Sequence, residues 1–425
     1  MMSDVRELLD RASRSFYEEN KNDPLVDQLF TLGADPIIRG ALRSAYAGMS
    51  LNGDAEVFKQ ALMLMPDVAR VFGDDASRSV LIGHSIGGTG TTIDSLVQNL
   101  FSQAKLRMFF LRLSVEIETF VGLTQDGLSR LLEALAGDEV PVIDLIQFTG
   151  IELSSDVSIQ TPWGTIRRAP DVEARREDLA QRPLGPLSSV ILAHERLEKI
   201  SFASVDGFER LARDTSVFQF SERVSVLFPL SCALATPSGE PFAPAFGWET
   251  ILVPFLSLSG WRSGSRSGQG RRGSSVDGVV EKIEEWSRII DAQHTASIDV
   301  SARRAVSAVA IRDDRSDSLI DAVMVWENLV GTSAETTFRV TSALAKLLEP
   351  DLEKRLAFRK ELKRIYDLRS RVVHGDAVDA SKVHASAKEA ISVALSALGA
   401  SYLRGSGWLD LSSEERADTL LLREA

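Results

Sequence analysis

The feature that most constrains the fold is an arginine on the apolar side of a helix in the last quarter of the chain. Residues 364–376 have the pattern of a charged amphipathic helix that ends at Gly375, because glycine readily adopts the left-handed turn that closes helices. At about 100° per residue, Arg369 falls within the apolar stripe of this helix. The stripe consists of Leu362, Ile365, Leu368 and Val372. An unpaired buried charge is strongly destabilising, so we expect Arg369 to be paired or to line a functional pocket.

A histidine follows this arginine at a spacing that separates the two side chains. His374 lies five residues after Arg369, which is about 140° further round an ideal helix. One straight helix therefore cannot bring both side chains to one point. Either the helix frays at Gly375, or two copies of the motif meet across a dimer axis. Both arrangements would make a small cationic pocket with a titratable imidazole.

A second helix also carries a charge within its apolar stripe. Residues 317–331 predict a helix that starts near Asp317 and ends at Gly331, and Glu327 falls within its seam. The seam consists of Leu319, Ile320, Val323, Trp326 and Val330. Opposite charges in two core-facing stripes indicate that Glu327 and Arg369 meet or line one pocket. The alternative is a buried salt bridge that only fixes the register of the helices.

These residue types suit the cleavage of RNA, which carries its own nucleophile in the 2′-hydroxyl group. His374 can act as general base or acid, and Arg369 can stabilise the charge that develops on the phosphate. Ser370 lies on the His374 face of the helix and can orient the imidazole or a phosphate, and Arg371 is a candidate phosphate contact. Such chemistry needs neither a metal ion nor a cofactor. A helix-end histidine and exposed arginines also occur without catalysis.

The same stretch resembles a known family. The residues from Arg369 to His374 fit the R-x4-H signature of HEPN domains, and the text IYDLRSRVVHG is similar to the Apea-like branch of that superfamily. Tyr366, the Arg-Ser pair and the His-Gly pair carry this similarity, which is best over residues 317–401. The resemblance implies a helical bundle that dimerises and acts as a metal-independent endoribonuclease, often in toxin or anti-phage systems. Some members of the family bind only nucleotides or partners.

From the resemblance and the residue chemistry together, we expect Arg369 and His374 to be the catalytic residues. The supporting or substrate-binding residues are expected to be Ser370, Arg371, Tyr366 and Glu327. The expected partners are RNA, a second copy of the chain, and a phage-derived or nucleotide trigger. The two alternatives are a non-catalytic HEPN-like binding or dimerisation module and, with less support, a serine hydrolase.

Composition limits the class of protein. A length of 425 residues predicts two or three domains, and 44% hydrophobic with 25% charged residues is ordinary for a globular chain. Cys232 is the single cysteine, which excludes an internal disulfide and a cysteine-based zinc site. Without a long apolar run or a signal peptide, we expect a cytoplasmic protein that does not enter the membrane. The net charge of −12 argues against a general nucleic-acid coat but allows a local basic cleft.

The fold class expected from the patterns is α+β, predominantly α, with a C-terminal HEPN-like helical bundle. Residues 1–139 are expected to be mostly helical and residues 140–261 to be mixed α/β, with a buried helix near 217–235 among β-branched strand runs. Residues 262–275 form a Gly/Ser/Arg-rich linker or loop, and residues 276–425 form the HEPN-like domain. The linker contains four arginines and no acidic residue, and it is alternatively an arm that contacts RNA. These arginines are Arg262, Arg266, Arg271 and Arg272.

One further motif suggests different chemistry. The segment GHSIGG has the G-x-S-x-G spacing of a nucleophile elbow, in which Ser85 would be the nucleophile and His194 or His294 the base. An elbow serine should be followed at once by a helix, whereas glycines and threonines follow Ser85. We therefore favour a Gly-rich connection between two elements, and we interpret His194 as a surface residue.

Overall fold

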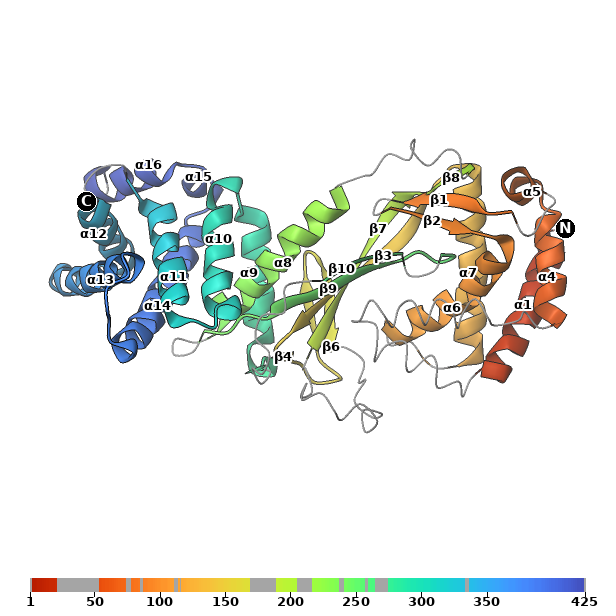
Figure 1. Ribbon diagram of the computed structural model, residues 1–425, viewed down its shortest axis with the longest axis horizontal. Helices are drawn as coiled ribbons and strands as arrows, with labels where there is room; N and C mark the ends of the chain where they lie inside the picture. The colour runs from red at the N-terminus through yellow and green to blue at the C-terminus, as the bar shows by residue number, and fades with distance from the viewer. Residues whose placement is uncertain are drawn as a thin grey trace.

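The chain is predominantly helical and of the α+β class, as the sequence predicts (Figure 1). Helices gather at both ends of the molecule, and a long antiparallel sheet lies between them. The computed structural model describes residues 2–20, 53–73, 78–84, 87–110, 114, 116–168, 189–204, 216–236, 241–256, 259–263, 274–332 and 336–423.

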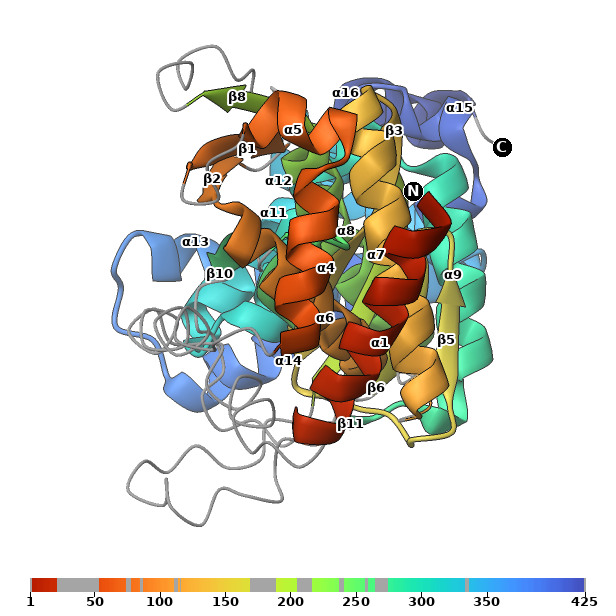
Figure 2. The same ribbon diagram turned by 90° about the vertical axis from the view of Figure 1, so that its right-hand side faces the viewer.

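The N-terminal end is built from amphipathic helices. These are α1 (Met2–Asn20), α4 (Gly53–Met63), α5 (Pro66–Phe72), α6 (Ile93–Phe110) and α7 (Ile117–Ala136). Pro66 occupies the first turn of α5, where a missing N–H has no consequence. Figure 2 shows α1 between α4 and α7, with which it packs. Phe16, Phe101 and Phe120 stack in the core that these helices enclose.

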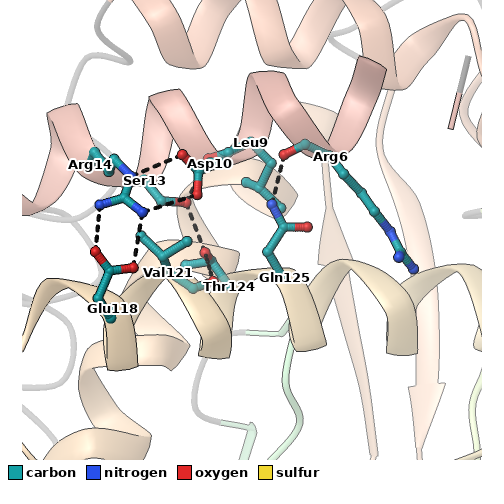
Figure 3. Close-up of polar contacts among 9 residues, drawn as sticks. All are labelled: Arg6, Leu9, Asp10, Ser13, Arg14, Glu118, Val121, Thr124 and Gln125. Carbon is teal, nitrogen blue, oxygen red and sulfur yellow. Dashed lines mark hydrogen bonds and ion pairs between the residues drawn. The ribbon is translucent and has the colours of Figure 1, made fainter. Parts of the chain in front are cut away.

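Polar contacts fix α1 against α7 (Figure 3). The hydroxyl groups of Ser13 and Thr124 are both buried and lie 2.7 Å apart. At the exposed edge, the Arg14 guanidinium donates to Asp10 on its own helix and to Glu118 on α7. Each hydroxyl also lies within hydrogen-bond distance of a carbonyl in its own helix, that of Leu9 for Ser13 and that of Val121 for Thr124, so both buried groups have partners that offset their lost hydration.

Strands from distant parts of the chain form the sheets. A small sheet has the order β2-β1-β8, and the large antiparallel sheet has the order β10-β9-β3-β7-β6-β5. The strands of these two sheets are β1 (Val80–His84), β2 (Gly87–Thr91), β3 (Glu139–Thr149), β5 (Ser158–Thr161), β6 (Gly164–Arg168), β7 (Ser189–Lys199), β8 (Ser201–Ser204), β9 (Ala245–Leu252) and β10 (Ser259–Ser263). The short strands β4 (Ile151–Glu152) and β11 (Ser274–Ser275) pair in parallel. Helix α8 (Ser216–Ala235) is the helix expected near 217–235, and much of it is buried.

The C-terminal end is helical. It consists of α9 (Val280–Gln293), α10 (Asp299–Val306), a π-helical turn (Ser307–Ile311), α11 (Arg315–Val330), α12 (Thr336–Leu348), α13 (Leu352–Val373), α14 (Ala380–Leu403), α15 (Ser406–Leu409), α16 (Ser413–Asp418) and a second π-helical turn (Thr419–Arg423). Short 3-10 turns (Asp277–Val279 and Ala296–Ile298) precede α9 and α10. Helix α11 starts earlier than the sequence predicts, because its N-cap is Asp314 rather than Asp317. The Asp314 carboxylate accepts the N–H of Ser316 at 2.6 Å, which places the cap three residues upstream.

Two apolar clusters meet on the large sheet. Val140 and Val142 on β3 belong to the cluster formed with the N-terminal helices, whereas Ile146 and Phe148 on the same strand belong to the cluster formed with the C-terminal helices. All four share one face, because side chains alternate along a strand. The second cluster contains residues from both sides of the predicted 262–275 linker. The domain boundaries stay predictions, and none of the described helices is long and apolar enough to cross a membrane.

Candidate functional site

Helix α13 begins and ends at residues suited to those positions. Asp351 caps its start by accepting the N–H of Lys354 at 2.9 Å. At the other end Gly375 has φ +77°, and its N–H donates to the carbonyl of Val372 at 3.1 Å. A residue with a side chain is strained at this φ, so the prediction that Gly375 closes the helix is confirmed. Leu362, Ile365 and Leu368 are buried on the inner face of α13.

Arg369 and Glu327 meet, as their positions in two apolar stripes predict. The Arg369 Nη2 atom lies 3.4 Å from Glu327 Oε2, and the two side chains keep 21% and 28% of their surface exposed. The Tyr366 hydroxyl donates to the other carboxylate oxygen of Glu327 at 2.5 Å. Burial, followed by the hydrogen bond to Glu327, raises the pKa of Tyr366 far above its usual range, so this hydroxyl remains a donor. Among the described residues, the buried Nε atom of Arg369 has no hydrogen-bond partner.

His374 lies at the exposed end of the same helix. Its backbone N–H donates to the Ser370 carbonyl at 3.0 Å, so the helical hydrogen bonding continues up to His374 without fraying. Its side chain is exposed and makes no hydrogen bond within the described ranges. The about 140° offset of an ideal helix is therefore kept, and one chain does not bring Arg369 and His374 together.

The neighbours expected to support the site lie on the same helix. Ser370 is half-buried, and Arg371 is exposed with its Nε atom 3.3 Å from the Asp376 carboxylate. A phosphate that binds Arg371 would have to compete with this carboxylate. Helix α13 carries eight lysine and arginine residues against three acidic ones, in a chain whose net charge is −12. The exposed site is therefore locally basic.

The arginines of the predicted linker are placed only in part. Arg266, Arg271 and Arg272 lie outside the described residues. Arg262 belongs to β10, where its backbone is the direct partner of Glu249 on β9. Glu249 is buried. The Arg262 position is thus part of the large sheet, whereas the sequence places it in a linker.

The segment with the G-x-S-x-G spacing lies at a strand-to-strand connection. Ser85 itself is outside the described residues, but the arms on either side of it pair antiparallel, with Gly83 opposite Gly88 and His84 opposite Gly87. The following helix, α6, starts only at Ile93. A nucleophile elbow needs a strand followed directly by a helix, so this geometry favours the Gly-rich connection.

His294 is already engaged by other side chains. Its two ring nitrogens lie 2.7 Å from the Tyr402 hydroxyl and 2.7 Å from the Asp299 carboxylate. Burial lowers the pKa of His294, although the Asp299 hydrogen bond and charge oppose this effect. A histidine held on both sides in this way is a structural residue of the C-terminal helices.

The interpretation of His194 as a surface residue holds only in part, because its side chain is half-buried. The imidazole stacks on the Phe220 ring of α8 with centroids 4.0 Å apart, and burial lowers its pKa. Asp144, which lies directly opposite His194 on β3, is only 1% exposed. Both residues face the interior because α8 covers this part of the sheet.

A buried ionic cluster surrounds this pair, and sequence reasoning missed it. The Arg196 guanidinium lies 2.8 Å from Asp144 and 2.7 Å from Glu198, and both carboxylates are buried. Burial raises the pKa of Asp144, although Arg196 lowers it in part. The sequence feature that could have indicated this cluster is Asp144, an acidic residue within the apolar run VPVIDLIQF. Glu327 was identified by the same kind of pattern, a charge within an apolar stripe. In this cluster one guanidinium contacts two buried carboxylates, which is the form of a structural network.

No family model matches the chain, and neither does any curated protein or solved structure with which it was compared. The HEPN resemblance therefore stays a prediction. Within the described part of the chain, no group of three or more His, Cys, Asp and Glu side chains is arranged to hold a metal ion.

Proposed function

We propose that this protein is a metal-independent endoribonuclease of the HEPN type that works as a homodimer in the cytoplasm. The observation that carries the proposal is the arrangement on α13. Glu327 and Tyr366 hold Arg369 at a half-buried position, and His374 stands exposed at the end of the same basic helix. An arginine and an imidazole are the two groups that cleavage by the 2′-hydroxyl requires.

Each residue of the proposed site has a separate role in cleavage. His374 takes the proton of the 2′-hydroxyl or delivers one to the leaving 5′-oxygen, and Arg369 stabilises the negative charge on the phosphate. Glu327 positions Arg369, and Tyr366 in turn fixes the Glu327 carboxylate. The excess of cations on α13 attracts the RNA backbone. Because the helix does not fray, Arg369 of one protomer meets His374 of the other.

The biological setting proposed for this activity is defence, as an abortive-infection effector or toxin. The N-terminal helices and the sheet would sense a phage-derived or nucleotide trigger, restrain the nuclease, or position its RNA. The buried cluster that continues from the sheet into the C-terminal helices offers a mechanical connection for such control.

The main alternative is a non-catalytic nucleotide- or partner-binding module in which Glu327 and Arg369 only fix two helices. Their half-buried, 3.4 Å contact is compatible with that role, so activity measurements must separate the two. A serine hydrolase has less support, because the Ser85 segment joins two antiparallel strands.

The deciding experiment is cleavage of RNA by the purified full chain in EDTA. The expected products carry a 2′,3′-cyclic phosphate and a 5′-hydroxyl, and DNA of the same sequence should remain intact. A single 2′-deoxy substitution should block the cut at that position, since it removes the nucleophile. Arg369→Ala and His374→Ala should each abolish cleavage in a folded protein, whereas Ser85→Ala should cleave normally. Metal-dependent cleavage, equal cutting of DNA, or a requirement for Ser85 would contradict the proposal.

A further inference from the structure

An exposed aromatic ring lies beside the basic helix, well away from His374. Phe338 on α12 keeps 54% of its surface exposed, although it belongs to a helix that is otherwise packed into the bundle. The Arg359 guanidinium of α13 lies over this ring, 4.5 Å from its centroid. An exposed cation–aromatic pair adds only about 0.5–1 kcal/mol to stability, so this ring contributes little to folding and is accessible to a ligand.

The ring adjoins the outer face of α13. Residues within about 60° of His374 on a helical wheel form a continuous stripe that is exposed or half-buried. Leu352 and Leu356 are 62% and 51% exposed at the N-terminal end of the stripe, and the cations Arg359, Lys360 and Lys363 follow along the helix. The stripe includes Leu352, Leu356, Arg359, Lys360, Lys363, Asp367 and His374, and Asp367 forms an ion pair with Lys363.

The spacing along the helix separates this patch from the catalytic candidates. Arg359 and His374 are fifteen residues apart, which is about 22 Å along an α-helix. A dimer that joins the His374 ends of two α13 helices therefore leaves Phe338 accessible. Arg359 and His374 lie on one face of α13, at a separation that a few nucleotides of single-stranded RNA can span.

We propose that Phe338 and Arg359 form a base-stacking subsite for single-stranded RNA, about 22 Å along α13 from His374. The inference rests on the proposed function, and it names the form of RNA that the same face takes. Proteins that bind single strands combine aromatic rings, on which unpaired bases stack, with cations that follow the phosphates. Here Phe338 supplies the ring and Arg359 and Lys360 supply adjacent charges, whereas Lys363, which lies nearer to His374, is paired with Asp367.

The charges favour this occupant over a second copy of the chain. In a two-fold symmetric contact each patch faces its own copy, so Arg359 and Lys360 would approach the same cations. Like charges repel, and a polyanion removes that repulsion. Duplex RNA offers no unstacked base for the ring, so the subsite should select unpaired strands with little sequence preference.

The test is binding of a labelled single-stranded 2′-O-methyl RNA to the full chain, followed by fluorescence anisotropy. This probe lacks the nucleophilic hydroxyl, so binding is measured without cleavage. Phe338→Ala should weaken binding roughly 5- to 150-fold, the range measured for removal of a stacking ring. Phe338→Trp should restore it, and Arg359→Ala should weaken it. Arg404→Ala is the matched control, because Arg404 also lies over an aromatic ring, that of the buried Trp408.

The possible results separate the subsite from the nuclease. The subsite is refuted if the wild-type chain does not bind the probe, or if Phe338→Ala binds it as the wild type does. It is also refuted if Phe338→Ala changes only the sedimentation mass, which would make the patch a contact between copies. Cleavage that survives Arg369→Ala and His374→Ala would instead defeat the proposed nuclease site, while the loss of binding in Phe338→Ala would still stand.

Discussion

Two of the arginines that face carboxylates in this protein, Arg196 and Arg369, have different surroundings. Arg196 lies 2.8 Å from Asp144, which is 1% exposed, and it also contacts Glu198. Arg369 lies 3.4 Å from Glu327, and both side chains keep about a quarter of their surface exposed. The first arginine is fixed by full burial of its partners. The second is held by one longer contact that water can reach, and the proposed function requires that Arg369 exchange this carboxylate for a phosphate.

Because Glu327 is only half-buried, its replacement should have a moderate effect on the free energy of unfolding. Glu327→Gln should lower the free energy of unfolding by about 1–2 kcal/mol, less than the 3–5 kcal/mol of a fully buried pair, because water still reaches Arg369. Chemical denaturation measures this difference. Glu361→Gln is the control, since Glu361 forms an exposed pair with Arg364 on the same helix. A melt identical to that of the wild type would show that Glu327 does not position Arg369.

At the scale of single elements, α13 is the clearest case of local determination. Its cap, its apolar stripe and its closing glycine are all within twenty-five residues of sequence. The strands around residues 140–252 and the helix α8 were also predicted from short patterns. The start of α11 differs from the prediction, because Asp314 caps the helix in place of Asp317. The Asp314 carboxylate accepts the free N–H groups of Ser316 and Asp317.

The closing turn of α13 yields a prediction for one element. Gly375→Ala should destabilise the protein by about 1 kcal/mol, because alanine is strained at φ +77°. An added Cβ would meet no atom within 4 Å, so the whole effect is conformational. Thermal or chemical denaturation measures the loss. Gly407→Ala tests the assignment, because Gly407 has equal space and an ordinary helical backbone, and its replacement should be neutral or slightly stabilising.

At the scale of the whole molecule, one strand belongs to two cores. The face of β3 packs on the N-terminal helices at one end and on the C-terminal helices at the other, with Asp144 between them. Arg196 lies between the carboxylates of Asp144 and Glu198 at this junction and attracts both. The ionic cluster therefore links two neighbouring strands at the place where the two apolar clusters meet.

Replacement of Arg196 should show how strongly the stability of the fold depends on this ionic cluster. Arg196→Met should lower the free energy of unfolding near neutral pH by about 3–5 kcal/mol, because it leaves Asp144 and Glu198 buried without a positive charge. The loss should shrink at acid pH. Burial raises the pKa of Asp144, so in the folded variant this carboxyl protonates first, and stability falls as pH rises through the raised pKa. Denaturation across a pH series measures this trend. Lys363→Met, which removes an exposed pair, should show neither effect.

The proposed site combines Arg369 of one protomer with His374 of the other. This arrangement predicts complementation between two inactive variants. In a dimer of Arg369→Ala with His374→Ala, one site loses both groups and the other keeps both. Mixing the two inactive proteins should therefore restore RNA cleavage, up to the activity of one site per dimer. A site formed within one chain would stay inactive in every mixture. Sedimentation should show a dimer at micromolar concentration, and a monomer would count against the scheme.

The sequence by itself determined the features that depend on neighbours along the chain. The end of α13 at Gly375, the seams that contain Arg369 and Glu327, and the α+β class all follow from periodicity, caps and turn chemistry. The contact between Glu327 and Arg369 could also be predicted from the sequence. Two opposite charges in apolar stripes are strongly destabilising when buried alone, and pairing with each other removes that cost.

Only the tertiary structure decided which residues of the sheet are buried. His194 has polar neighbours in sequence, yet α8 places Phe220 over its ring. Asp144 and Arg196 are 52 residues apart and become partners through strand pairing. The structure also decided that α13 stays helical to its end, so Arg369 and His374 of one chain remain on different faces of the helix. Burial depends on segments that are distant in sequence, and no local pattern contains that information.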